Sequence, residues 1–65
     1  MFEEDKNKRL IKAAKEGHTA IVQALLANGA EVNAKNKFGW TALKWAAKGG
    51  HTEIVKLLKH HGAKE

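Results

Sequence analysis

The fold is decided by residues 39–58, GWTALKWAAKGGHTEIVKLL, because much of this pattern also occurs earlier in the chain. Shifting the sequence by 33 residues aligns positions 8–32 with positions 41–65, and 12 of the 25 pairs are identical. A fixed period of this length indicates a solenoid of stacked units, in which each unit buries its apolar face against its neighbour.

Each unit is predicted to contain two short helices followed by an extended finger. The first helix of the second unit has apolar residues at helical spacing and ends at the pair Gly49-Gly50. Thr52 is expected to act as N-cap of the helix that follows. Between the units, residues 36–39 (NKFG) are typical of the tight reversal of a β-hairpin.

Composition limits the chain to one small domain, residues 1–65, with 43% hydrophobic residues and no cysteine. Its net charge of +5 comes entirely from the second half, because residues 1–33 are balanced. The sequence has no apolar run of membrane-spanning length and no signal peptide at its start. We therefore expect a soluble protein that is cytoplasmic, or produced as an engineered recombinant protein, and not secreted.

Two strings, GWTALKWAAKGGHTEIVKLL and KAAKEGHTAIVQALLANGAEVNAKN, resemble the ankyrin repeat family, whose pattern is G-x-T-P-L-H-x-A-A-x-x-G-H-x-E-I-V-x-L-L-L-x-x-G-A-D-V-N-A. The resemblance implies a mainly α fold, an ankyrin-repeat solenoid of two helix–turn–helix units joined by a β-hairpin-like finger. Repeat 1 is expected over about 5–36 and repeat 2 over about 37–65. It also implies a concave surface that binds other proteins.

The two copies differ where a neighbouring repeat would be missing. Lys12 stands where the second copy has Trp45, which is expected to pack back onto the first repeat. At the other end, Lys59 stands where the first copy has Leu26. Both differences suit faces open to water, so our hypothesis is an N-cap joined to a C-cap, as in a designed or idealised scaffold. The alternatives are a self-associating stack and a fragment of a longer natural array.

The residues that enzymes use are missing from the sequence. It has no serine or cysteine, and its threonines stand where turns and caps need them. The four histidines lack the spacing of metal ligands, since His18 and His51 belong to repeat loops while His60 and His61 point in different directions on a helix. No glycine-rich phosphate loop is present. We expect no enzymatic activity, no metal and no cofactor.

Binding to another protein is the function class that remains. The resemblance places seven residues at positions used for partner contact: Lys35, Lys37, Phe38 and Trp40 on the finger, with Lys15, Lys48 and Gly49 on the first helices. Aromatic side chains among cations are typical of contact hot spots, although Trp40 also suits structural packing. The lysine excess is interpreted as a solubilising surface, and nucleic acid is not expected because the second half contains no arginine. A monomer is favoured over a homo-oligomer.

One position is a candidate for modification. The stretch LLANGAEVNAK resembles the asparaginyl hydroxylation site of ankyrin repeats, with Asn33 after Val32. The alternative interpretation, which we favour, is that Asn33 orders the entry to the finger.

Overall fold

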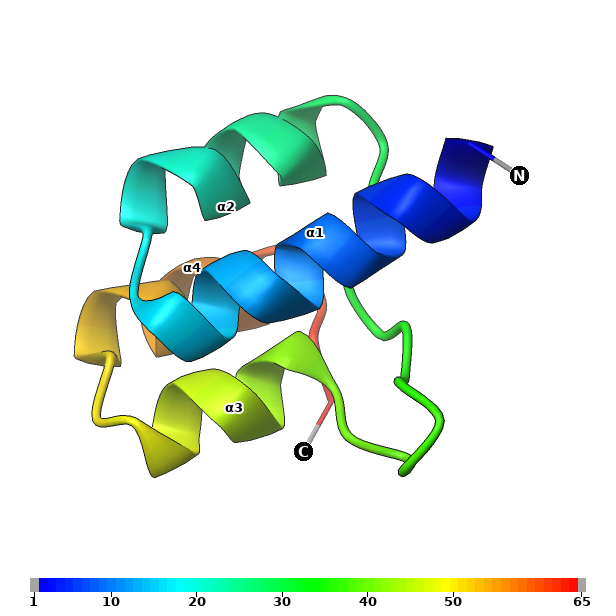
Figure 1. Ribbon diagram of the computed structural model, residues 1–65. Helices are drawn as coiled ribbons and strands as arrows, with labels where there is room; N and C mark the ends of the chain where they lie inside the picture. The colour runs from blue at the N-terminus through cyan, green and yellow to red at the C-terminus, as the bar shows by residue number, and fades with distance from the viewer. Residues whose placement is uncertain (1, 65) are drawn as a thin grey trace.

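The computed structural model describes residues 2–64, with side chains from Lys6 to Lys64. These residues form four helices, α1 (Phe2–Glu16), α2 (Thr19–Ala27), α3 (Ala42–Lys48) and α4 (Thr52–His60). In Figure 1 the chain runs along α1, turns back along α2, passes through an extended segment and repeats the turn with α3 and α4. The mainly α fold predicted from the sequence is confirmed.

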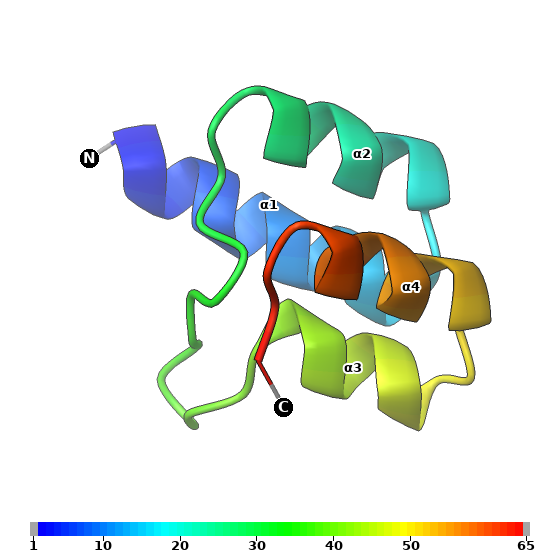
Figure 2. The same ribbon diagram turned by 180° about the vertical axis from the view of Figure 1, so that it is seen from behind.

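The second helix pair stacks on the first. Helix α3 packs against α1, and α4 packs against α2. Seen from behind, α2 and α4 lie side by side (Figure 2). The extended segment, residues 35–41, is called the finger below, and it projects at the edge opposite the two short turns that join the helices within each pair (Figure 1).

Side chains from all four helices form one apolar core. Among the described residues no polar side chain is buried, and the buried apolar ones are Leu10, Ile11, Ala13, Ala14, Val22, Leu26, Ala42, Leu43, Ala46, Ile54 and Leu58. Alanines dominate the contact between α1 and α3, and their small side chains allow the two backbones to approach closely.

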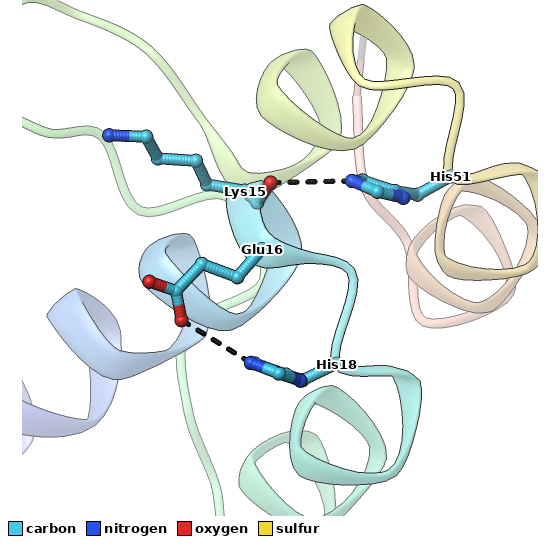
Figure 3. Close-up of polar contacts among 4 residues, drawn as sticks. All are labelled: Lys15, Glu16, His18 and His51. Carbon is cyan, nitrogen blue, oxygen red and sulfur yellow. Dashed lines mark hydrogen bonds and ion pairs between the residues drawn. The ribbon is translucent and has the colours of Figure 1, made fainter.

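Histidine joins the two turns across the stack. The Nε2 atom of His51 lies 3.3 Å from the backbone oxygen of Lys15, and Figure 3 shows the ring reaching from the second turn to the end of α1. A Cβ atom placed on Gly17 or on Gly49 would come within 2.7 Å of this ring. A side chain at either glycine would therefore force the imidazole to shift from its place between the turns.

His18 occupies the same position in the first pair but makes a different contact. Its Nε2 lies 3.4 Å from Oε1 of Glu16 on its own turn, and both side chains are about half exposed (Figure 3). Among the described residues, no preceding turn lies beside His18, so the ring stays on the surface.

Asparagines close the stack at the opposite edge. The Asn33 side chain accepts a hydrogen bond from the backbone N–H of Lys64 at 2.8 Å and donates one to the carbonyl of Gly62 at 3.2 Å. On the first pair, the Asn7 side chain accepts from the backbone N–H of Glu31 at 2.8 Å. Glu31 and Lys64 are 33 residues apart, so the early turns of α1 supply to the first pair the contact that the finger entry supplies to the second.

One local expectation is corrected, that of the N-cap of α4. Thr52 is the first residue of α4 and not its N-cap, because His51 occupies the cap position and makes no side-chain capping bond. The Thr52 hydroxyl instead donates to the carbonyl of Gly50 at 3.4 Å. The hairpin-like finger is present as predicted, with a single antiparallel bridge between Lys35 and Thr41 and no longer strand within residues 2–64.

The repeat leaves two end faces uncovered by the described residues. Ile54 is 1% exposed because the first pair covers it, whereas its counterpart Ile21 is 49% exposed. Lys12 and Lys59 are both exposed. None of the helices within residues 2–64 combines the length and apolarity needed to cross a membrane.

Candidate partner-binding surface

The finger is held in shape by Asn36. Its side-chain oxygen accepts hydrogen bonds from the backbone N–H groups of Phe38 at 2.8 Å and Trp40 at 3.0 Å. Its own backbone N–H donates to the carbonyl of Trp40 at 2.8 Å, and Gly39 completes the turn with φ 79°. An asparagine that bonds its own backbone neighbours orders a short loop without help from a distant element.

The tip of the finger presents an aromatic ring to solvent. Phe38 is 74% exposed, more than any other large apolar side chain among the described residues. The Lys37 ammonium lies 5.5 Å from the centre of its ring. This close pairing of a cation and an aromatic face leaves most of the ring available for contact.

Two indoles lie where the finger meets α3. The ring centres of Trp40 and Trp45 are 4.7 Å apart with the planes tilted by 47°. Trp45 is half-buried and also packs against the core, where its Nε1 has no hydrogen-bond partner. The indole pair therefore joins the finger to the helices on which it stands.

Three lysines surround the indole pair. Lys15 lies 5.0 Å from the Trp45 ring centre, Lys44 lies 5.7 Å from that of Trp40, and Lys48 lies 5.1 Å and 5.8 Å from the two rings. Within the described part of the chain, none of the three has a carboxylate at salt-bridge distance. The cluster thus combines aromatic faces with uncompensated positive charge, which favours a ligand that brings apolar surface and carboxylates.

Metal chemistry is not indicated at this surface. Across the side chains of residues 6–64, no group of three histidines or acids is placed to hold a metal ion. His60 and His61 lie edge to face with ring centres 5.9 Å apart, at the end of α4.

Comparison with known protein families gives a match over most of the chain. The family described as "Ankyrin repeats (many copies)" matches residues 10–58, which include all of α2 and α3 and most of α4. The chain belongs to the ankyrin repeat family. Ankyrin repeats generally act as protein-interaction modules.

Two curated relatives match parts of this ankyrin chain. A mitochondrial disaggregase of Homo sapiens is 46% identical over 39 residues, and the ankyrin repeat domain-containing protein SAT10 of Stachybotrys chartarum is 49% identical over 37 residues. These matches cover 60% and 57% of the chain. They span only 6% and 2% of the relatives themselves, so the similarity concerns a short segment of each.

The ankyrin fold brings some of the predicted contact residues together and separates others. Lys15, Trp40 and Lys48 meet at the indole pair. Lys37 and Phe38 lie at the finger tip. Lys35 lies at the base of the finger, where it lines a groove that does not include the two indoles. Gly49 contributes space for the His51 ring. Asn33 lies between the ankyrin repeats, away from the aromatic cluster.

Sequence reasoning missed two members of this surface. Lys44 is not among the seven residues predicted for partner contact, and Trp45 is predicted only to pack back onto the first repeat. Trp45 does pack, but its ring is also the platform for two lysines. The available signal was spacing, since Lys44 and Lys48 are four residues apart and share one side of α3.

Proposed function

We propose that the chain is a non-enzymatic protein-binding module whose contact surface is formed by the finger and the first helix of each repeat. The proposed contact residues are Lys15, Lys35, Lys37, Phe38, Trp40, Lys44, Trp45, Lys48 and Gly49. Membership of the ankyrin repeat family supports the protein-binding class. The disaggregase activity of the human relative is not proposed for this chain, because the match spans 6% of that protein.

The observation that carries this proposal is the exposure of Phe38 at the tip of the finger, the segment that also carries Trp40. A ring that is 74% exposed adds no core packing, yet Asn36 holds the turn beneath it in one shape. A pre-formed aromatic contact loses little conformational freedom on binding, which is why aromatic residues dominate interface hot spots. The surrounding lysines select for a partner segment with carboxylates.

A selection experiment tests the proposal. A phage-displayed peptide library is selected on the wild-type protein, and the affinities of the recovered peptides are measured by calorimetry. We expect sequences rich in Asp and Glu with an apolar residue between them. Phe38→Ala should weaken their binding by about tenfold or more.

Ile21 provides the matched control for that experiment. It is the other large apolar side chain exposed in the described chain, at 49%, and it lies on α2 away from the finger. Ile21→Ala should leave peptide affinity within about twofold of the wild type. Recovery of no acidic binders, or equal losses for Ile21→Ala and Phe38→Ala, would argue against the finger as the contact surface.

A second candidate function is self-association through the end faces, favoured by the exposure of Ile21. The net charge of +5 opposes it, because two copies repel each other. The monomer is therefore the proposed state, and the polar residues Lys12 and Lys59 are proposed as closures of an idealised two-repeat stack. Light scattering over a concentration series tests this, and a mass that rises with concentration would favour the assembly instead.

A further inference from the structure

A groove of about 610 Å³ lies on the end face formed by the second repeat, on the side away from the first. Its floor is apolar and is formed by Leu43 and Ala47 of α3 with Val55 of α4. This set of three residues is called the C-terminal end face. The groove is distinct from the aromatic cluster, but Lys44 borders both, and Lys35 belongs both to the groove and to the contact surface of the proposed function.

The first repeat shows what a face of this shape receives. The counterparts of Leu43, Ala47 and Val55 in the 33-residue repeat are Leu10, Ala14 and Val22, and each of these is 0% exposed. They are buried because α3 and α4 stack on α1 and α2. In the second repeat, Ala47 is exposed and Val55 is half-buried. The same backbone arrangement therefore already accommodates packed helices once within this molecule.

Charge distinguishes the open face from the covered one. Lysines from three segments border the groove: Lys35 from the finger, Lys44 from α3 and Lys64 from the C-terminal residues. Lys59 also lines it, at the position where the first repeat has the buried Leu26. No acidic residue is among the lining residues described for the groove. A helix that brings carboxylates beside its apolar stripe can pair them with Lys35, Lys44 and Lys64.

We propose that the C-terminal end face docks an acidic amphipathic helix of a protein partner. The apolar stripe of that helix covers Ala47 and Val55, and its glutamates or aspartates face the bordering lysines. This is an interaction surface additional to the aromatic cluster, and it does not depend on binding at Phe38 or at the indole pair.

A second copy of this chain matches the groove in shape but not in charge. The opposite end of the stack offers Ile21 and Leu25 as apolar surface. Arg9 and Lys12 lie beside them and outnumber Glu16, the acidic residue in the same lining. If this end of one copy docked into the groove of another, these cations would lie close to the bordering lysines and repel them. An acidic helix removes this repulsion, and it is therefore the occupant that we favour over a second copy.

The test uses a synthetic acidic helix as the probe. The peptide has about 18 residues, or about five turns, with leucines along one stripe and glutamates flanking it, and both ends are blocked. Its control carries lysine in place of every glutamate. Titration into the ¹⁵N-labelled 65-residue chain should shift the backbone amide signals of Ala47, Val55 and Lys64 with the acidic peptide and leave them in place with the basic one.

Three variants locate the binding. Ala47→Glu puts a carboxylate on the floor of the groove and should weaken binding of the acidic peptide by about tenfold. Lys64→Glu should weaken its binding by about fivefold. Lys8→Glu is the matched control, since it makes the same change in net charge on an exposed residue of α1 outside the groove, and it should change affinity by less than about twofold. Circular dichroism confirms that each variant remains folded.

Three results would overturn the proposal, the third being dimerisation of the wild-type chain. One is equal weakening by Lys8→Glu and Lys64→Glu, which would mean unspecific attraction to a basic protein. Another is a set of shifts confined to Phe38, Trp40 and Trp45, which would assign the acidic helix to the finger surface. If the wild-type chain itself dimerises through Ala47 and Val55 in light scattering and the titration, the occupant is a second copy and the proposal fails.

Discussion

The Asn33 side chain ties the backbone N–H of Lys64 to the first repeat, with a donor–acceptor distance of 2.8 Å. The two residues are 31 positions apart, and this bond with its companion to Gly62 joins the finger entry to the segment after α4. Asn7 makes the equivalent bond to Glu31, but from within a helix. Each repeat thus has the segment after its second helix fixed by one asparagine carboxamide.

Removing the Asn33 carboxamide should destabilise the stack. Asn33→Ala deletes two hydrogen bonds and should lower the free energy of unfolding by about 1–2 kcal/mol, whereas Asn7→Ala deletes one and should cost about 1 kcal/mol. Urea denaturation followed by far-UV circular dichroism measures both. Gln23→Ala, at an exposed position of α2, is the control and should change little. A larger effect of Asn7→Ala than of Asn33→Ala would contradict this account.

Trp45 should contribute more through its ring than through its N–H group. Trp45→Ala empties a half-buried site against the core and should cost about 2–4 kcal/mol, close to the whole stability of so small a domain. Trp45→Phe keeps an aromatic ring and removes a buried Nε1 that has no partner, so it should cost about 1 kcal/mol or less. Thermal melts compare the two. A melt of Trp45→Ala that matches the wild type would place this ring outside the folded core.

The contact between Gly49 and His51 should appear as a coupling between two substitutions. Gly49 has φ −83°, an ordinary value for alanine, so Gly49→Ala introduces only the collision of its Cβ with the imidazole at 2.7 Å. We expect a loss of about 1–2 kcal/mol in the wild-type background. In the His51→Ala background the same change should be neutral or slightly stabilising, because the obstacle is gone and glycine is replaced. Equal losses in both backgrounds would dispose of this explanation.

Charge at Lys59 should control whether copies of the chain associate. Lys59→Leu restores the residue type that the first repeat buries at this position and enlarges the apolar floor of the groove. We expect a mass in light scattering that rises with protein concentration, as for an uncovered apolar patch. Lys56→Leu is the control, because Lys56 is exposed on the same helix but does not line the groove. A Lys59→Leu protein that stays monomeric would show that this lysine does not limit association.

Much of the fold was predictable because the same apolar residues and glycines recur after 33 residues. Ala13 and Ala14 recur as Ala46 and Ala47, and this repetition predicted the first helix of each repeat. The glycines after the helices predicted where each helix ends. The period also placed the uncovered faces, since Ile21 and Ile54 are one residue type with opposite exposure. Such differences arise from neighbours and not from local sequence.

The rest depended on contacts that no local pattern encodes. Asn7 bonds to Glu31 across 24 positions, and nothing in the residues around Asn7 distinguishes it from other polar positions of an exposed helix. Thr52 looked like a cap because hydroxyls favour that place, yet the packing of His51 between two glycines takes the cap position and moves the helix start by one residue. The lysines around Trp45 come from both repeats, so only the stacked structure unites them.

The engagement of Asn33 also determines when chemistry can reach it. Both polar atoms of its carboxamide are bonded, to Gly62 and to Lys64. An enzyme that binds this carboxamide competes with these two hydrogen bonds, so we expect it to act when the tail after α4 separates from the finger entry, a local opening that costs less than global unfolding. The rate of any modification at Asn33 would then depend on how often this local opening occurs. A modified asparagine would be a lasting chemical record that this end of the stack had come apart.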